Sequence, residues 1–183
     1  MHEFEPCTHA DIADAIRCAA PEVFSTMLSM DLTGGETTIG PMVPGSHSGI
    51  IALLGLTGER SGSGQFSCEP AFGCRIASQM LMAEYQTVDD DVLDAIAEVA
   101  NMIVGNIKNM LEVKLGPMGL STPTIVFGGD FDTRIAGNPD RITVKFICGD
   151  DIATVQVVIA PKSTRHTPRE HHHHHETHMA LVG

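Results

Sequence analysis

Hydrophobic residues recur at intervals of three and four along residues 8–30, and this spacing predicts an amphipathic helix. Thr8 is the expected N-cap of this helix, with Asp11 at the capping-box position three residues later. Pro21 falls inside the pattern. Because proline lacks the backbone N–H that a helix interior needs, we expect a kink or a break there.

The same spacing predicts a second helix over residues 70–84 and a third, longer one over residues 87–116. Thr87 or Asp89 is the expected cap of the longer helix, whose acidic first turn suits the positive end of the helix dipole. Gly116, which a proline follows directly, is the expected end of this helix.

Short apolar runs bounded by turn residues predict the strands. The glycine-rich residues 58–64 are expected to close a hairpin, because a phosphate cradle would need a strand–loop–helix context with a lysine. Gly149 and the two aspartates after it are expected to turn the final hairpin. The predicted strands lie at residues 37–41, 48–58, 65–69, 121–129, 141–149 and 152–160.

These elements predict an α/β fold of the α+β kind, with long helices packed against a mostly antiparallel sheet. A single domain over residues 8–160 is long enough to bury its own core. The composition then changes abruptly, and residues 161–183 are expected to form a disordered, His-rich tail. An expression tag or an accidental tract explains its five adjacent histidines better than a metal store, because the run has no partners to fix a geometry.

Acidic residues outnumber Lys and Arg by 23 to 11, so the net charge is −12 with neutral histidines. Nucleic acids and anionic membranes bind basic surfaces, which argues against both as main partners. The longest apolar run, residues 49–56, is too short to cross a bilayer, and the acidic N-terminus lacks a signal-peptide pattern. We therefore expect a soluble, cytoplasmic protein.

The cysteines are odd in number, and no pair of them forms a CxxC motif. A disulfide framework or a zinc site is therefore not expected, and we interpret them as buried free thiols. They are Cys7, Cys18, Cys68, Cys74 and Cys148.

At about 100° per residue, polar positions of the longest predicted helix form a narrow stripe apart from its broad apolar face. The stripe comprises Asp94, Glu98, Asn101, Gly105, Lys108 and Glu112. A mid-helix Gly costs about 1 kcal/mol relative to Ala, and an exposed mid-helix Asn is mildly unfavourable. Close approach by another molecule would explain both residues. Periodicity alone leaves two interpretations open, a working surface for another protein or an ordinary solvated face.

The segments EVANMIVGNIKNMLE and LSTPTIVFGGDF resemble the CheX family of chemotaxis phosphatases, relatives of CheC and FliY. The family motif is Glu-x-x-Asn followed by three residues and Gly on a long helix, which here corresponds to Glu98, Asn101 and Gly105. The Thr-Pro-Thr segment at residues 122–124 and the order of elements over residues 8–160 also match. CheC relatives carry a second Glu-x-x-Asn, which the first two predicted helices lack, so the CheX branch is favoured.

The resemblance implies a CheC/CheX-like fold and hydrolysis of the aspartyl phosphate of a CheY-like response regulator. By resemblance, Asn101 orients the attacking water and Glu98 pairs with the regulator's active-site Lys, while direct general-base action by Glu98 is a second interpretation. Gly105 is expected to permit close approach, and Asp94 and Lys108 are expected binding residues beside it. No metal or other cofactor is expected on this chain, because the regulator would supply the Mg²⁺.

The resemblance also suggests a homodimer, with two sheets joined edge to edge, and the final predicted strands, which we expect to be exposed, would permit this. The alternative function is a non-catalytic adaptor that binds a response regulator or a flagellar switch component. A hydrolase with its own nucleophile is not expected, because no Ser, Cys or His lies in a recognisable elbow or triad motif.

Overall fold

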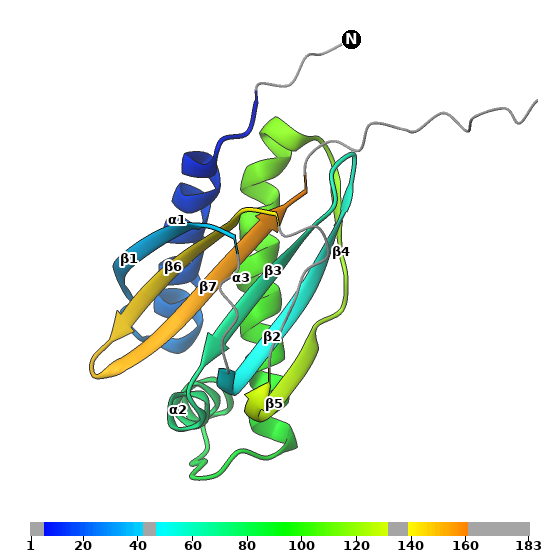
Figure 1. Ribbon diagram of the computed structural model, residues 1–183. Coiled ribbons are helices and arrows are strands. Elements are labelled where there is room, and N and C mark those ends of the chain that lie inside the picture. Colours follow the sequence, from blue (N-terminus) through cyan, green and yellow to red (C-terminus); the bar gives the residue numbers. More distant parts are fainter. Residues whose placement is uncertain (1–5, 42–46, 132–138, 161–183) are drawn as a thin grey trace, which may run out of the picture.

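The computed structural model describes residues 6–41, 47–131 and 139–160, which form three helices and one seven-stranded antiparallel sheet (Figure 1). The helices are α1 (His9–Leu28), α2 (Pro70–Leu81) and α3 (Asp90–Leu115). The strands are β1 (Thr33–Gly40), β2 (His47–Gly58), β3 (Gly62–Cys68), β4 (Met118–Leu120), β5 (Thr124–Phe131), β6 (Arg141–Cys148) and β7 (Asp151–Ile159). The predicted fold class is confirmed.

The strands follow the order β1-β6-β7-β3-β2, and the remaining side of β2 is shared by two strands. β4 pairs with the last residues of β2, and β5 pairs with its first half. This sharing is possible because β2 is 12 residues long, which is more than either partner needs. β4 and β5 therefore form one interrupted edge of the sheet, while β1 forms the other edge.

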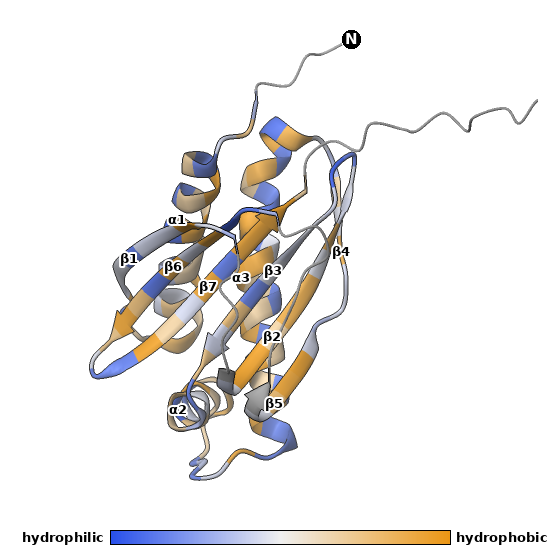
Figure 2. Cartoon of the chain, viewed as in Figure 1, coloured by the Kyte–Doolittle hydropathy of each residue, from blue (hydrophilic) through white to orange (hydrophobic). Residues whose placement is uncertain are grey.

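Both α1 and α3 lie on one face of the sheet, and α2 lies across one end (Figure 1). Hydrophobic residues concentrate along β2, β7 and α3 (Figure 2). Between these layers, four phenylalanines and many aliphatic side chains are fully buried. Burial of each large side chain contributes roughly 1.5–3 kcal/mol, so this layer of contacts fixes how the helices sit on the sheet.

The predicted capping box of α1 is confirmed. Thr8 Oγ1 accepts a hydrogen bond from the Asp11 backbone N–H at 3.2 Å, and Asp11 Oδ2 accepts one from the Thr8 N–H at 2.8 Å. Of the kink or break expected at Pro21, the break does not occur, because α1 continues through Pro21 to Leu28. The buried side chains that surround Pro21, such as Phe24, hold the helix together despite the missing N–H.

Asp89, and not Thr87, caps α3, since its carboxylate accepts the Val92 N–H at 3.0 Å. The predicted end at Gly116 is confirmed. Gly116 has a φ of 77°, and its N–H donates to the Glu112 carbonyl at 2.9 Å. A left-handed φ of this kind suits glycine, so the chain can leave the helix here and enter β4.

Three strand predictions need correction. The strand expected at residues 121–129 is β5, which begins only at Thr124, and β4, which precedes it and pairs with the end of β2, was not predicted. β1 is longer than predicted, since its polar residues are held by pairing with β6 rather than by burial. β3 begins inside the expected turn, because Gly62 pairs with β7.

The expectation that the final strands lie exposed at a sheet edge is wrong. β6 lies between β1 and β7, and β7 lies between β6 and β3, so both strands are hydrogen-bonded on two sides. Pairing of β7 with β3 is a long-range contact that local patterning does not reveal. Among the described strands, a second sheet could join this one at β1 or at the β4–β5 edge.

The described cysteines are free thiols, as predicted, but only Cys68 and Cys74 are buried. Burial raises the pKa of the Cys68 thiol to about 12. Cys18 is exposed, which contradicts the expectation for that residue. No helix in the described ranges is both long and apolar enough to traverse a bilayer. The predicted tail over residues 161–183 lies outside the described residues.

Asp11 also joins the start of α1 to the end of α3, because its carboxylate accepts from Lys114 Nζ at 2.8 Å. This bond and those from Thr8 lower the pKa of Asp11 from 3.8 to about 2. A carboxyl whose folded pKa is depressed stabilises the fold above its unfolded pKa and loses that contribution as pH falls through the folded pKa.

Asp11→Asn is therefore expected to flatten the part of the stability–pH curve between about pH 4 and pH 2. Urea unfolding at pH 7, 4 and 3 measures the slope. Glu22→Gln, at an exposed carboxylate of the same helix that forms no ion pair among the described residues, is the matched control and should keep the wild-type slope. Equal slopes for wild type and Asp11→Asn would contradict the assignment of this link.

Candidate functional site

One side of α3 packs on the sheet so closely that it sets the rotation of the helix. Ile96, Ile103, Val104 and Ile107 are fully buried on this side. A Cβ added at Gly64 of β3 would lie 2.5 Å from a Val104 methyl, so the glycine makes room for the helix. The opposite side of α3 therefore has to face away from the core.

Glu98 and Asn101 lie on that outward side. Glu98 is exposed and Asn101 is partly exposed. They are three residues apart, so their side chains are neighbours on the helix surface. Within the described part of the chain, neither side chain forms a hydrogen bond or an ion pair. A carboxylate and a carboxamide thus stand side by side with their hydrogen-bonding capacity unused.

Gly105 lies one turn beyond Asn101 and is partly buried beside β4. A Cβ added there would meet only Leu120 Cδ2, at 3.8 Å, which is ordinary van der Waals contact. The fold itself therefore does not require glycine at this position. The missing side chain instead leaves space beside Asn101, so an external molecule can approach the helix backbone there.

Lys108 and Glu112 share the stripe but are engaged inside the chain. Lys108 Nζ donates to Glu112 Oε1 at 2.7 Å and to the Met118 carbonyl at 3.2 Å, while the Met118 N–H donates to Glu112 Oε1 at 2.8 Å. These bonds lower the pKa of Glu112, chiefly through the Lys108 ammonium. The pair binds both backbone groups of Met118, as a neighbouring strand would, and fixes β4 against α3.

The structure thus gives Lys108 a positioning task that sequence reasoning missed. The i,i+4 spacing of Lys108 and Glu112 signals their ion pair, but nothing local signals the contact with β4. Direct contact between Lys108 and a partner stays a prediction. Asp94 is exposed one turn before Glu98, in the acidic first part of α3, and its binding role likewise stays a prediction.

Ser121 fixes the interruption between β4 and β5, and sequence reasoning missed it too. Its Oγ accepts from the Gly55 N–H at 2.8 Å and donates to the Thr122 carbonyl at 2.9 Å, and its own N–H donates to the Gly55 carbonyl at 2.9 Å. A Cβ added at Gly55 would lie 3.5 Å from Ser121 Oγ, so the serine side chain packs directly on the glycine. These hydrogen bonds therefore hold the sheet edge formed by β4 and β5 in place across the gap between the two strands.

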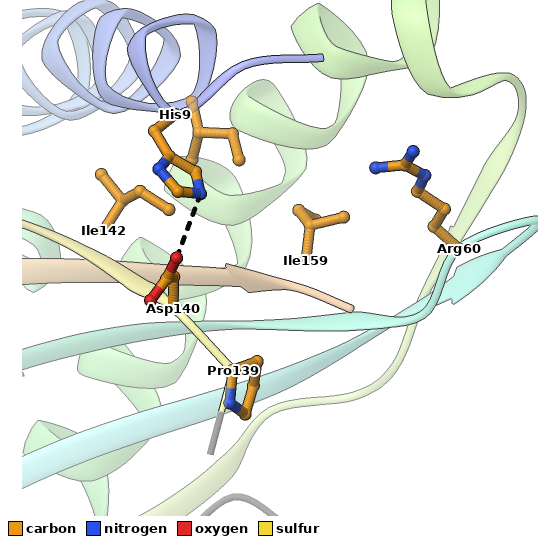
Figure 3. Close-up of a pocket in the computed structure, with 7 residues that line it drawn as sticks. His9, Arg60, Pro139, Asp140, Ile142 and Ile159 are labelled. Carbon is orange, nitrogen blue, oxygen red and sulfur yellow. Dashed lines mark ion pairs between the residues drawn. The ribbon is translucent and has the colours of Figure 1, made fainter. Parts of the chain in front are cut away.

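A separate cavity of about 420 Å³ opens at the start of α1 (Figure 3). His9 and Asp140 pair across it at 3.7 Å, and Arg60 lies on its other side. It contains no residue of α3, so it is distinct from the site described above. Among the residues that the structure describes, no three His, Cys, Asp or Glu side chains gather as metal ligands.

Known proteins resemble this chain in sequence. The family described as chemotaxis phosphatase CheX matches residues 50–147, which is more than half of the chain. The CheY-P phosphatase CheX of Thermotoga maritima is 26% identical over 143 residues, which cover 78% of this chain and 92% of that protein.

Solved structures share the fold. A chemotaxis protein CheX from Desulfovibrio desulfuricans has a TM-score of 0.73 at 23% identity, covering 82% of this chain and 99% of its own. A complex of CheX with CheY, BeF₃ and Mg²⁺ from Borrelia burgdorferi contains a chain with a TM-score of 0.64 at 23% identity, covering 81% and 97%. The sequence match and the fold together show that this chain belongs to the CheX family of chemotaxis phosphatases.

Proposed function

We propose that this protein hydrolyses the aspartyl phosphate of a CheY-like response regulator, with Asn101 orienting the attacking water. The observation that carries the proposal is the pair of unengaged side chains, Glu98 and Asn101, on a rigid helix of a CheX-family chain. The names of the relatives support the choice of substrate, since one is a CheY-P phosphatase and another was solved with CheY.

The reaction requires few groups from the phosphatase. Water attacks phosphorus, the bond between phosphorus and the aspartyl oxygen breaks, and the products are a carboxylate and inorganic phosphate, which with solvent takes up the water's protons. The regulator would bring the phosphoryl group, the Mg²⁺ and a Lys. What it lacks is a water held in line with the breaking bond, and such positioning removes several kcal/mol of barrier.

The carboxamide of Asn101 suits that task. Its carbonyl oxygen accepts a hydrogen bond from the water while its NH₂ donates to another group, and it carries no charge that would repel phosphoryl oxygens. Because α3 is packed along its length, the amide is presented from a rigid element, which favours insertion into a partner's pocket.

Glu98, one turn before Asn101, would pair with the regulator's active-site Lys and so set the orientation of docking. Its exposed carboxylate has no partner among the described residues, which leaves it available for that cation. An ion pair of this kind acts mainly on association, whereas a general base would act on the chemical step. Kinetics can therefore separate the two interpretations.

The second candidate function is a non-catalytic adaptor for a response regulator or a flagellar switch component. An adaptor would use the same outward side of α3 but would not need a water-orienting amide next to a carboxylate. The unengaged Glu98 and Asn101 therefore favour the enzyme. Release of inorganic phosphate from a phosphorylated regulator in Mg²⁺ separates the two functions.

A homodimer, a cytoplasmic location and Mg²⁺ supplied by the regulator belong to the same proposal. Among the described strands, the sides open to a second sheet belong to β1 and β5, since Lys108 and Glu112 already bind the outer backbone groups of Met118 in β4. Edge-to-edge joining would therefore use β1 or β5 and not the final hairpin.

Asn101→Ala is expected to lower the rate of phosphate release by about 100-fold or more, because the water loses its orienting group. Among the described residues the substitution removes no hydrogen bond or ion pair, so the unfolding midpoint should stay near that of wild type. A phosphate-release assay with the phosphorylated regulator measures the rate. A wild-type rate would overturn the assignment of Asn101.

Glu98→Gln is expected to raise the regulator concentration needed for half-maximal rate and to leave the saturated rate nearly unchanged. The charge is lost while shape is kept, so the effect reports on docking. Initial rates across a range of phosphorylated regulator concentrations give both parameters. A large fall in the saturated rate would instead assign general-base action to Glu98.

Gly105→Ala is expected to stabilise the fold by up to about 1 kcal/mol and, at the same time, to weaken productive docking. The added methyl fits against Leu120 inside the chain but occupies the surface that the regulator would approach. Urea unfolding and steady-state kinetics on the same preparation test both parts. A more stable variant with unchanged kinetics would show that nothing approaches Gly105 closely.

A further inference from the structure

Among the residues that the structure describes, Arg60 is the one lysine or arginine whose side chain forms no hydrogen bond or ion pair. Arg141 donates to the neutral side chain of Gln156. The other described cations pair with carboxylates, and they are Arg17, Arg75, Lys108, Lys114 and Lys145. Acidic residues outnumber Lys and Arg by 23 to 11, so a cation without a carboxylate partner needs an explanation.

The backbone around Arg60 is held in place. Arg60 lies in the turn between β2 and β3, and this turn is tied to the end of β7. The Ala160 N–H donates to the Ser61 carbonyl at 2.8 Å, and Gly62 pairs with Ile159. Arg60 is partly buried, and its guanidinium is directed toward the cavity of about 420 Å³ at the start of α1 (Figure 3). The unpaired charge is thus positioned at the wall of a cavity.

The lining of this cavity combines apolar and polar groups. Ile12 of α1, Ile142 of β6 and Ile159 of β7 contribute aliphatic side chains. On the side away from Arg60, His9 Nε2 and Asp140 Oδ2 lie 3.7 Å apart (Figure 3). A volume of about 300–1,000 Å³, with apolar walls and a few polar groups, is typical of small-molecule sites.

The acids near this cavity already have partners. Asp140 pairs with His9. Asp11, in the first turn of α1, accepts from Lys114 Nζ and from the backbone N–H of Thr8, both at 2.8 Å. Within the described ranges, the protein therefore supplies Arg60 with no counter-charge. A negative group from outside the chain can occupy that place without displacing an existing bond.

We propose that this cavity binds a small organic monocarboxylate, with its carboxylate on Arg60 and its apolar body over the isoleucines. A guanidinium presents parallel N–H donors that match the two oxygens of a carboxylate. The aliphatic walls stabilise an apolar body by removing its surface from water. Asp140, on the far side, repels a second negative charge, so the site selects against dicarboxylates. The cavity contains no residue of α3, so this proposal does not depend on the proposed function.

NMR of protein labelled with ¹³C at the isoleucine δ1 methyls tests the proposal, with hexanoate as the probe. We expect saturable shifts at Ile12, Ile142 and Ile159 with a Kd of about 1 mM, and no shift at Ile96 or Ile103 of α3. Hexanamide has the same body without the charge, and adipate carries a charge at both ends. Each is expected to bind about tenfold more weakly than hexanoate.

The role of each charge is tested by substitution. Arg60→Gln is expected to weaken hexanoate binding by about tenfold or more, and to keep the wild-type unfolding midpoint because Arg60 has no described partner to lose. Arg17→Gln is the matched control, since Arg17 pairs with Asp14 and does not line the cavity, and it should keep the wild-type Kd. Asp140→Asn removes the repulsion and should let adipate bind about as tightly as hexanoate.

Shifts that do not saturate, or that hexanamide produces at the same concentrations, would overturn the proposal, because the site would then not select a carboxylate. An equal Kd for wild type and Arg60→Gln would do so as well. Tighter binding of inorganic phosphate than of hexanoate, measured in the same way, would also contradict it, because the cavity would then recognise charge without an apolar body.

Discussion

The rotation of α3 on the sheet is the constraint on which the candidate site depends. Ile96, Ile103 and Val104 are wholly buried, and Gly64 lets the helix approach β3 closely. Because each residue advances the helix by about 100°, this packing leaves only one side of α3 open. Asn101 lies on that side. A modest rotation would turn its amide toward the core, where an unpartnered carboxamide is costly.

A second set of contacts fixes the position of β4 beside that amide. Lys108 and Glu112 bind the backbone of Met118, and Ser121 closes the gap that follows β4. The edge of the sheet is thereby held beside the helix, with Leu120 next to Gly105. The structure thus combines a rigid helix with a low, fixed border, which suits a surface that inserts one side chain into another protein.

Local patterns predicted much of this from sequence. Helical spacing identified α3, Asp11 and Gly116 gave the signals for a capping box and a helix end, and the motif placed Glu98 and Asn101 on one face. The missed features depend on contacts distant in sequence. β4 is only three residues long and forms because β2 has a free end, the interior position of β7 comes from pairing with β3, and the positioning task of Lys108 needs β4.

The most direct test of the account is a count of turnovers. Wild-type protein is mixed at a tenth of the concentration of a phosphorylated CheY-like regulator in Mg²⁺, and inorganic phosphate is followed in time. We expect accelerated release that proceeds well beyond one phosphate per protein, because Asn101 would act without being consumed. Phosphorylated regulator that binds the protein but decays at its intrinsic rate would contradict the account and leave the adaptor function.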